Sequence, residues 1–325
     1  MPTQSRMNVT YMTQIETKTI NDTECLESTH LSFPRYQGKA RDCYDLGDTL
    51  LLISTDRISA FDRNLGLIPH KGQILNQLSA WWFEKTQHIT PNHFIELTTS
   101  NAMRVRKCRS LPIEVIVRAY LTGSTQTSIW TQYQQGERRF FDTVLPNGLA
   151  KNTRLAKPIL TPTTKALDHD KPLTPGELIQ FSGLTSNEWK MIGEKALQLF
   201  QLASEYLLTR GLILVDSKYE FGYTETGELI LIDELHTPDS SRYWLASEHE
   251  KNPAQVQNFD KEVLRQWYKK HCNPYHDETL PAIPKELSQT ISERYQYLYE
   301  TITQQKFRKE KPSCVASLVL KASNL

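Results

Sequence analysis

Three residues that could do chemistry alternate along one apolar stretch of the chain. Asp216, Lys218 and Glu220 follow the run Leu212-Ile-Leu-Val215, and an apolar run of this kind, bounded by Gly and Thr, predicts a strand. Side chains alternate across a strand, so the three charged groups project from the same face. Because they follow the strongly apolar first half of the strand, we expect these charges to lie in a cleft.

A second apolar run, Glu228–Glu234, predicts the partner strand of a hairpin. If Thr226-Gly227 is a two-residue loop, counting back places Glu220 directly opposite Asp233. Facing carboxylates repel, and a cation between them would remove that cost. Mg²⁺ is typically held by one or two carboxylates plus substrate phosphates, so the pattern predicts a magnesium–nucleotide site. The alternative is an ordinary solvated hairpin face, and a bulge at Gly222 would break the register.

Small and cationic residues occur together near the head of an earlier predicted strand. In the tetrapeptide Gly38-Lys-Ala-Arg41, the glycine lets a ligand approach the backbone closely, and the lysine and arginine supply two cations. Both features suit a polyphosphate. The spacing of the residues is not that of a Walker A loop. Alone, such a tetrapeptide is more often a surface turn. The following strand, Thr49–Thr55, leads into Thr55-Asp-Arg-Ile-Ser-Ala-Phe-Asp62, and functional residues concentrate at such strand ends.

The run Leu111–Leu121 is rich in β-branched residues and predicts a further strand. Glu114 and Arg118 share one face of it, and charges on an otherwise apolar strand are costly unless they meet a ligand or a partner. Arg118 could bind a phosphate or carboxylate through two hydrogen bonds, and the turn after the strand brings Ser124 near it. The alternative is that both charges lie on an exposed sheet face.

Helical spacing of apolar residues predicts the elements that position these groups. Residues 1–30 have weak periodicity and are expected to form a frayed or partly ordered arm, with structure starting near Leu31. Residues 125–175 are interpreted as mostly loop, and His169, which has no second His or Cys at ligand spacing, is not expected to bind a metal. The predicted helices are 73–85, with its tryptophans in the core, a short one capped at Thr174, 186–210, 258–270 and 284–307.

Length and composition limit the class of protein. The chain has 325 residues, enough for two lobes, and a formal net charge of +1, which creates no field favouring nucleic acid or an anionic membrane. No apolar window is long enough to span a bilayer, and Met1–Thr10 lacks a signal-peptide core. Five scattered cysteines without a CxxC pair argue against a disulfide framework or a zinc site. We therefore expect a cytoplasmic globular protein.

Five motifs follow one another in order along the chain. They are Gly38-Lys-Ala-Arg-Asp42, Thr55-Asp-Arg-Ile-Ser-Ala-Phe-Asp62, Val117-Arg-Ala-Tyr-Leu-Thr-Gly-Ser124, Val215-Asp-Ser-Lys-Tyr-Glu-Phe-Gly222 and Asp233-Glu-Leu-His-Thr-Pro-Asp-Ser-Ser-Arg242. Together they resemble the family of phosphoribosylaminoimidazole-succinocarboxamide synthases, the SAICAR synthetases, from about Phe33 to Tyr299.

The resemblance implies an α+β fold similar to that of the ATP-grasp enzymes, with two lobes, antiparallel sheets and the nucleotide in the cleft between the lobes. The divisions it implies are an N-terminal arm (1–30), a smaller β-rich lobe that covers the nucleotide (31–112), a larger α+β catalytic lobe (113–307) and a C-terminal tail (308–325).

The family joins carboxyaminoimidazole ribonucleotide (CAIR) to L-aspartate in purine biosynthesis, cleaves ATP to ADP and phosphate, and requires Mg²⁺. A carboxylate is a poor electrophile, so an acyl phosphate is the expected activated form. The expected partners are these two small molecules, with no nucleic acid and no membrane; a monomeric state is left open. The alternatives are another ATP-dependent carboxylate–amine ligase or a small-molecule kinase on the same scaffold, and a non-catalytic nucleotide-binding protein. These would be expected to vary at Arg118, Ser124 or Arg242, or to lose Lys218, and all four are present.

The resemblance also implies roles for single residues. Catalytic roles fall to Lys218, Asp216 and Arg242, and the metal ligands would be Glu220 and Asp233. ATP would be bound by Gly38, Lys39, Ala40, Arg41, Lys107, Glu114, Glu220 and Asp233. The substrates would be bound by Arg118, Ser124, Asp216, Lys218, Ser241, Arg242, Arg265 and Lys165.

Some positions depart from the family pattern. Ala119 stands where the family commonly has Gly, residues 125–133 differ from the usual sequence, and the loop 168–171 lacks an expected acidic residue. Because of this difference in the loop 168–171, the resemblance does not assign the residues that bind aspartate. The tail 308–325 has no recognised counterpart.

Overall fold

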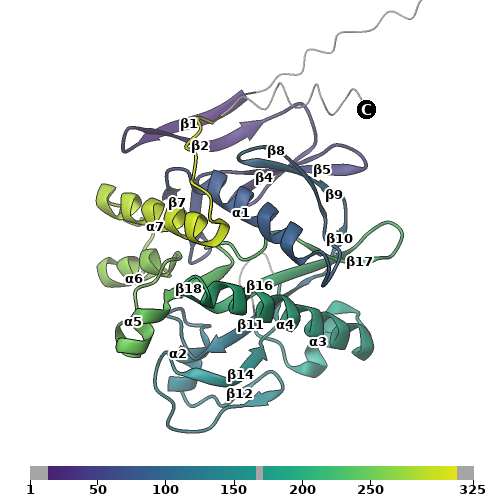
Figure 1. Cartoon of the computed structure of the whole chain (residues 1–325), viewed down its shortest axis with the longest axis vertical. Helices are drawn as coiled ribbons and strands as arrows, with labels where there is room; N and C mark the ends of the chain where they lie inside the picture. The colour runs from purple at the N-terminus through teal and green to yellow at the C-terminus, as the bar shows by residue number, and fades with distance from the viewer. Residues whose placement is uncertain (1–13, 166–170, 313–325) are drawn as a thin grey trace, which may run out of the picture.

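The computed structural model describes residues 14–165 and 171–312. Within this part of the chain, the two largest sheets have five and seven strands (Figure 1). The first is antiparallel and five-stranded, and its spatial order is β3 (Arg35–Gln37), β4 (Arg41–Asp45), β5 (Thr49–Ser54), β9 (Ala102–Arg106) and β8 (Phe94–Thr99). The chain then passes through β10 (Arg109–Ser110) into the second sheet. Both sheets are antiparallel, but each also pairs strands that are distant in the sequence, β5 with β9 in the first and β11 (Ile113–Tyr120) with β16 (Leu212–Tyr223) in the second.

The second sheet is organised around β16 (Leu212–Tyr223), a strand of 12 residues. On one edge β16 pairs with β11 (Ile113–Tyr120), which pairs in turn with β14 (Arg154–Leu160) and β15 (Thr163–Thr164). On its other edge β16 pairs with β18 (Ser241–Leu245) and, further along, with β17 (Leu229–Ile232). The short strand β10 lies on the β11 edge, because Ser110 and Ile230 both pair with Gly222 from opposite sides. The strand that carries the predicted charged groups is therefore the centre of the sheet.

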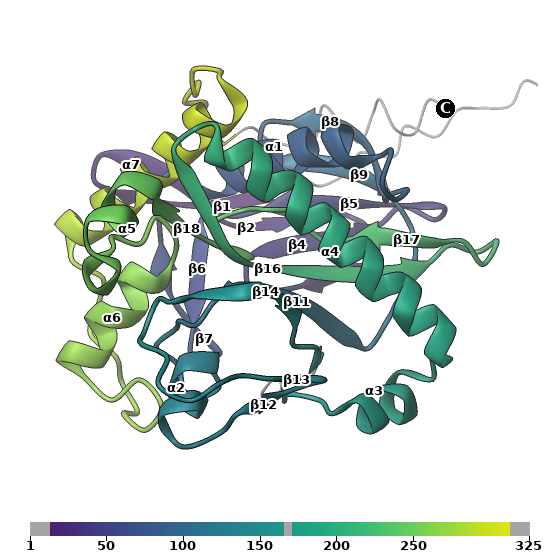
Figure 2. The same ribbon diagram turned by 60° about the horizontal axis from the view of Figure 1, so that its bottom comes forward.

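Seven α-helices and one short 3-10 helix, Pro253–Gln255, are found among the described residues. The α-helices are α1 (Lys71–Thr86), α2 (Ile129–Gln134), α3 (Pro175–Ser182), α4 (Ser186–Leu208), α5 (Ala246–Lys251), α6 (Glu262–His271) and α7 (Lys285–Thr303). The long helix α4 packs on β16 and β11, and Figure 2 shows it running across that sheet. Helix α1 packs on β5 and β8 of the first sheet and on α7. One apolar cluster joins these layers, with Trp82, Leu199 and Tyr219 fully buried in it, so the helices predicted at 73–85 and 186–210 are confirmed.

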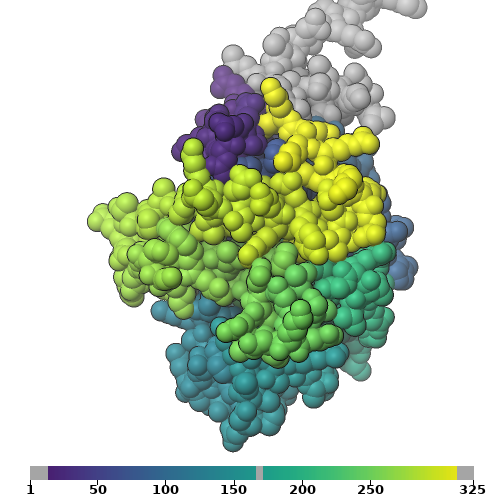
Figure 3. Space-filling view, turned by 60° about the vertical axis from the view of Figure 1, so that its left-hand side comes forward, coloured from purple at the N-terminus to yellow at the C-terminus, as the bar shows by residue number. Residues whose placement is uncertain are grey.

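The N-terminal part of the described chain differs from the prediction. Residues 14–30 form a hairpin of β1 (Gln14–Ile20) and β2 (Thr23–His30), so the expectation that structure starts near Leu31 is wrong. Leu26 is buried, and its backbone N–H donates to Asp56 Oδ2 at 2.7 Å. This contact is made with a distant acid, which local composition does not reveal. The hairpin lies beside α7 on the face shown in Figure 3, where Asn21 Nδ2 donates to the carbonyl of Lys285 at 3.0 Å.

Residues 125–175 are also more structured than predicted where they are described. They contain α2, the strands β14 and β15, and a small hairpin of β12 (Arg139–Phe140) and β13 (Thr143–Val144), and they end at the first residue of α3. Several of these elements have only two residues, too few to establish a periodic pattern. The predicted cap is confirmed, because Thr174 and Glu177 form a capping box at the start of α3. His169 and its neighbours Asp168 and Asp170 lie outside the described residues.

The remaining strands form one further hairpin, β6 (Arg57–Ala60) with β7 (Arg63–Leu67), directly after the first sheet's β5. The predicted helices 258–270 and 284–307 are present as α6 and α7. Among the described residues, none of the helices has the length and apolar character needed to cross a membrane.

Candidate active site

A cleft of about 1290 Å³ opens between residues of the first sheet's loops and the polar face of the second sheet. The predicted site residues that line it are Lys39, Glu114, Arg118, Asp216, Lys218, Ser241, Arg242 and Arg265. They come from the β3–β4 loop and from β11, β16, β18 and α6. Groups that are far apart in the sequence thus meet in one space, as the cleft prediction requires.

The β16–β17 hairpin has a different register from the predicted one. Tyr223 pairs with Leu229 and Glu220 pairs with Ile232, so Glu220 does not lie directly opposite Asp233. The favoured two-residue hairpin loops, types I′ and II′, both need a positive φ at the first loop position, which the β-branched Thr226 disfavours. The loop instead has three residues, 225–227, and of these only Gly227 has a positive φ, +82°. No bulge occurs at Gly222, because the ladder runs through it without a shift.

Glu220 and Asp233 nevertheless meet at one ammonium group. Lys218 Nζ lies 2.5 Å from Glu220 Oε1, 2.8 Å from Glu114 Oε1 and 3.6 Å from Asp233 Oδ2. Asp233 follows the last residue of β17 and has a φ of 73°, so the chain leaves the ladder there. Burial opposes the charge on Lys218, but the three carboxylates raise its pKa well above the usual value. Lys218 therefore stays protonated at the centre of the site.

Two further cations complete this acidic cluster. Lys165 Nζ lies 2.5 Å from Glu220 Oε2, and Arg41 donates to Asp233. Burial alone would raise the pKa of Asp233, but Arg41, Lys218 and Lys165 hold it below its ordinary value. Burial and the neighbouring charge of Asp233 raise the pKa of Glu220. The two acids are thus held in unlike electrostatic environments.

The donor set fits a magnesium ion that shares its ligands with a nucleotide. Among the residues the structure describes, no group of three or more His, Cys, Asp or Glu side chains could hold a metal by itself. Mg²⁺ does not need such a cage, because it is usually held by one or two carboxylates, phosphates and waters. Glu220 and Asp233, side by side at Lys218, supply two carboxylates of this kind.

A second cluster is built across three strands at the level of Asp216. In the ladders, Asp216 pairs with Arg118 of β11 on one side and with Arg242 of β18 on the other. Arg118 Nη1 lies 3.1 Å from Asp216 Oδ2, and Arg242 donates to the same oxygen. Because all three residues point to the same face of the sheet, the two guanidinium groups are presented together to the cleft.

Helix α6 adds the remaining groups of this second cluster. Glu262 Oε2 lies 3.3 Å from Arg265 Nη1 and 3.7 Å from Arg242 Nη2, and the buried Ser124 hydroxyl lies beside it. The Nε atoms of Arg242 and Arg265 are buried without a hydrogen-bond partner among the described residues. Buried donors without partners are unusual, and they fit a polyanionic ligand.

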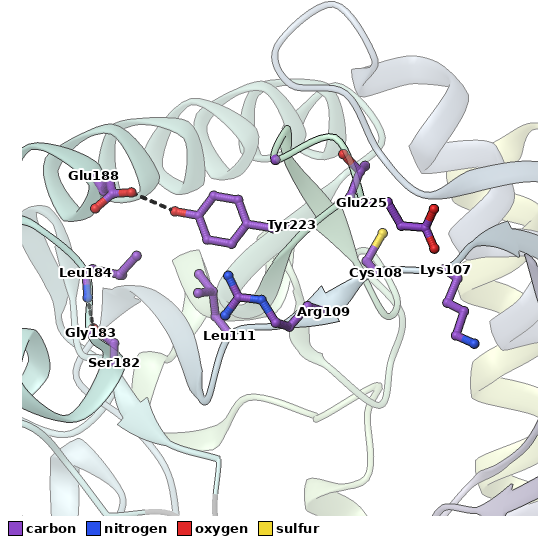
Figure 4. Close-up of a pocket in the computed structure, with 12 residues that line it drawn as sticks. Lys107, Cys108, Arg109, Leu111, Ser182, Gly183, Leu184, Glu188, Tyr223 and Glu225 are labelled. Carbon is purple, nitrogen blue, oxygen red and sulfur yellow. Dashed lines mark hydrogen bonds between the residues drawn. The ribbon is translucent and has the colours of Figure 1, made fainter. Parts of the chain in front are cut away.

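Some predicted residues lie outside the cleft. Lys107 Nζ bonds Asp45 Oδ2 at 2.7 Å, away from the acidic cluster, and lines a separate pocket of about 750 Å³ (Figure 4). Tyr223 in that pocket lies three residues after Glu220, so the pocket is on the opposite face of β16. Ser241 lines the cleft, but its hydroxyl donates to Ser217 Oγ at 2.9 Å. Gly38 and Ala40 belong to the loop that carries Lys39 into the cleft.

Sequence reasoning missed a buried ion pair at the floor of the cleft. Lys71 at the start of α1 is fully buried, and its Nζ lies 2.8 Å from Asp239 Oδ2, with Lys261 Nζ 3.7 Å from the same atom. Asp239 lies in the motif that ends at Arg242, so the pair ties the first half of the chain to the cleft loop. The run Pro69-His-Lys-Gly72 signalled only a chain break, and nothing local to Lys71 indicated its partner.

The fold and the cleft define the class of protein: two antiparallel sheets with helices, and a cleft of charged residues, in the SAICAR synthase-like, ATP-grasp-like arrangement. The chain matches the family model of SAICAR synthetase over residues 34–282, and it belongs to that family.

Relatives and solved structures agree with this assignment. The chain is 49% identical over 287 residues to the phosphoribosylaminoimidazole-succinocarboxamide synthase of Legionella pneumophila strain Paris, covering 87% of this chain and 92% of the relative. The chloroplastic synthase of Arabidopsis thaliana is 51% identical over 296 residues, covering 88% of this chain and 72% of the relative.

A SAICAR synthase from Saccharomyces cerevisiae, solved with SAICAR, is 30% identical with a TM-score of 0.70, covering 85% of this chain and 96% of that one. A SAICAR synthetase solved in complex with ADP is 28% identical with a TM-score of 0.65, covering 85% and 100%.

Proposed function

We propose that this protein is an ATP- and Mg²⁺-dependent ligase that condenses CAIR with L-aspartate to give SAICAR, ADP and phosphate in de novo purine biosynthesis. The observation that carries the proposal is the arrangement on β16, where Asp216 organises two arginines and Lys218 joins three carboxylates two residues further on. One strand thereby supports, on one face, a site for an anionic ribonucleotide and a site for a metal nucleotide.

In this reading the arginine cluster binds the ribonucleotide. Arg118, Arg242 and Arg265 supply guanidinium donors suited to phosphate, and Asp216 keeps the first two in a common orientation. Lys218 lies on the same face, two residues from Asp216, where its charge would neutralise the carboxylate of CAIR.

The nucleotide would lie against the other end of the same face. Lys39 and Arg41 would contact its phosphates, and Glu220 and Asp233 would hold Mg²⁺. The bound ion would neutralise charge on the phosphates during transfer. A carboxylate oxygen of CAIR forms a bond to the γ-phosphorus while the bond to ADP breaks. The aspartate amine then forms the C–N bond, phosphate leaves with its oxygen, and the amine loses a proton.

The lobe boundaries and the compartment belong to the same proposal. We assign residues 31–112 to a nucleotide-covering lobe and 113–307 to the catalytic lobe, since the two large sheets meet near Arg109. The cysteines among the described residues, Cys25, Cys43, Cys108 and Cys272, are all unpaired, as a reducing cytoplasm would keep them.

The test is ADP release by the purified protein with ATP and Mg²⁺, with CAIR and aspartate omitted in turn. ADP that forms only with both substrates, together with SAICAR in equal amount, would establish the ligase. ADP that forms with CAIR alone would indicate an activated carboxylate that is lost to water. ADP release that does not depend on CAIR would overturn the assignment and favour another ligase or kinase of the same fold.

A further inference from the structure

A buried arginine outside the predicted site holds the backbone of the Gly38–Arg41 loop. Arg57 on β6 has only 4% of its surface exposed. Its Nη2 donates to the Gly38 carbonyl at 3.0 Å, its Nε donates to the Lys39 carbonyl at 3.3 Å, and its Nη1 donates to the Glu27 carbonyl at 2.5 Å. One guanidinium group therefore fixes two successive peptide units of the loop.

The next carbonyl of the loop is held from the same segment. The backbone N–H and the hydroxyl of Thr55 both donate to the carbonyl of Ala40, at 2.9 Å and 2.8 Å. The loop is closed by the Gly38 N–H, which donates to the Arg41 carbonyl at 2.7 Å. The carbonyl oxygens of three consecutive residues are thus turned toward residues 55–57, away from any anion above the loop.

This orientation leaves the amides of the loop available. The N–H groups of Lys39 and Ala40 have no hydrogen-bond acceptor in the part of the chain that the structure describes. A run of backbone N–H groups without internal acceptors, next to lysine and arginine side chains, is suited to phosphate oxygens. A carbonyl oxygen turned the other way would repel them.

The arginine is itself fixed by a buried acid. Arg57 Nη2 lies 2.8 Å from Oδ1 of Asp42, which is fully buried on β4, immediately after the loop. Thr29 donates to the same carboxylate through its N–H and hydroxyl, at 2.8 Å and 2.9 Å, and Arg35 Nη2 lies 3.3 Å from it. A guanidinium group held on all sides cannot rotate away, so the loop is held in one conformation before nucleotide binds.

We propose that Arg57 is a positioning residue for the nucleotide: it orients the Gly38–Arg41 loop so that its amides face the phosphates of ATP. The inference rests on the proposed function of that loop. It predicts that Arg57 affects nucleotide binding specifically, although its buried side chain contacts only the protein.

The experiment compares Arg57→Gln and Arg57→Lys with Arg35→Gln. Arg35→Gln is the matched control, because it removes a guanidinium from the same carboxylate of Asp42 but no contact to the loop. The lysine variant keeps the charge beside Asp42 and loses the fork that spans two carbonyls. Dissociation constants for ADP with Mg²⁺ and for CAIR are measured by calorimetry for each folded variant.

We expect both Arg57 variants to bind ADP roughly tenfold or more weakly, a typical loss for removal of a supporting contact, with CAIR binding within about twofold of wild type. Arg35→Gln should bind both ligands as the wild type does. If Arg57→Gln does not fold, the ADP affinities of Arg57→Lys and Thr55→Val test the inference. Thr55→Val removes the hydroxyl that donates to the Ala40 carbonyl, so it too should weaken ADP binding and leave CAIR binding unchanged. Wild-type ADP binding in the folded Arg57 variants, or equal losses for ADP and CAIR, would overturn the inference. If the wild type itself fails to bind ADP with Mg²⁺, the proposed function of the loop fails first.

Discussion

Arg118 and Arg242 donate to the same oxygen atom, Oδ2 of Asp216, from the two strands that flank β16. Two guanidinium groups at this spacing repel, and the shared carboxylate offsets that repulsion. The side chains concerned are 12%, 12% and 8% exposed, so solvent screens the cluster weakly. The pair is therefore a structural element of the part of the cleft that we propose for the ribonucleotide.

Asp216→Asn should destabilise the protein and impair ribonucleotide binding together. Removing one partner from a buried ion pair leaves uncompensated charge and costs about 3 kcal/mol. Urea unfolding measures the loss of stability, and the KM for CAIR reports the loss of binding. As a control, Glu96→Gln removes the exposed partner of Arg104, which is 2.9 Å away, and should change stability by less than about 1 kcal/mol. Equal effects of the two substitutions would contradict this account.

Arg242→Lys should weaken CAIR binding about tenfold or more and leave ATP binding nearly unchanged. The planar guanidinium reaches Asp216 through Nη1 and Glu262 through Nη2, and its Nε has no hydrogen-bond partner among the described residues. A lysine ammonium cannot reproduce that fork. The separate KM values for CAIR and ATP measure the effect, and a loss shared equally by both substrates would count against the assignment.

Glu220→Gln and Asp233→Asn should both abolish turnover yet differ in stability. Each variant removes a proposed Mg²⁺ ligand, so raising the Mg²⁺ concentration should not restore the wild-type rate. Because its pKa is held low, the Asp233 carboxylate stabilises the fold at neutral pH, and Asp233→Asn should lower the Tm. Because burial and Asp233 raise the pKa of Glu220, Glu220→Gln should leave the Tm nearly unchanged or raise it. Turnover near that of the wild type in either variant would refute the metal assignment.

His236 should make the protein sensitive to acid. Its ring lies between those of Trp82 and Tyr219, and burial lowers its pKa from 6.5 to about 3. Between these values the unfolded chain binds a proton that the folded chain excludes, so this contribution to stability is lost as the pH falls from about 6.5 toward 3. In His236→Gln the fall in unfolding free energy between pH 7 and about pH 4 should be smaller than in the wild type. Parallel pH profiles for the two proteins would show that His236 is not responsible.

The alternation of charge along β16 could be predicted because it depends only on strand geometry. Asp216, Lys218 and Glu220 do share one face, and Lys218 does join Glu220 to Asp233. The hairpin register could not be predicted by counting alone, since it depends on whether Thr226 accepts a left-handed conformation. It does not, and Gly227 alone does so within the loop.

Contacts between distant segments could not be predicted from the sequence, for a different reason. Lys71, Asp239 and Arg57 are ordinary charged residues in their local context, and their burial becomes visible only when the two halves of the chain meet. The β1–β2 hairpin was missed likewise, because its anchoring acid, Asp56, lies 30 positions beyond Leu26. Patterns of a few residues report local structure, whereas these partners are determined by the tertiary fold.

The length of β16 has a further consequence for how this chain can vary. Asp216 and Glu220 are four positions apart on one uninterrupted strand, which separates their Cα atoms by roughly 13 Å. This spacing sets the distance between the proposed ribonucleotide and metal-nucleotide sites, and hence the size of a substrate that could reach both. Inserting or deleting a single residue between them would turn one carboxylate to the helix-covered side of the sheet. Length changes should therefore be tolerated in the 225–227 loop and excluded from residues 216–220.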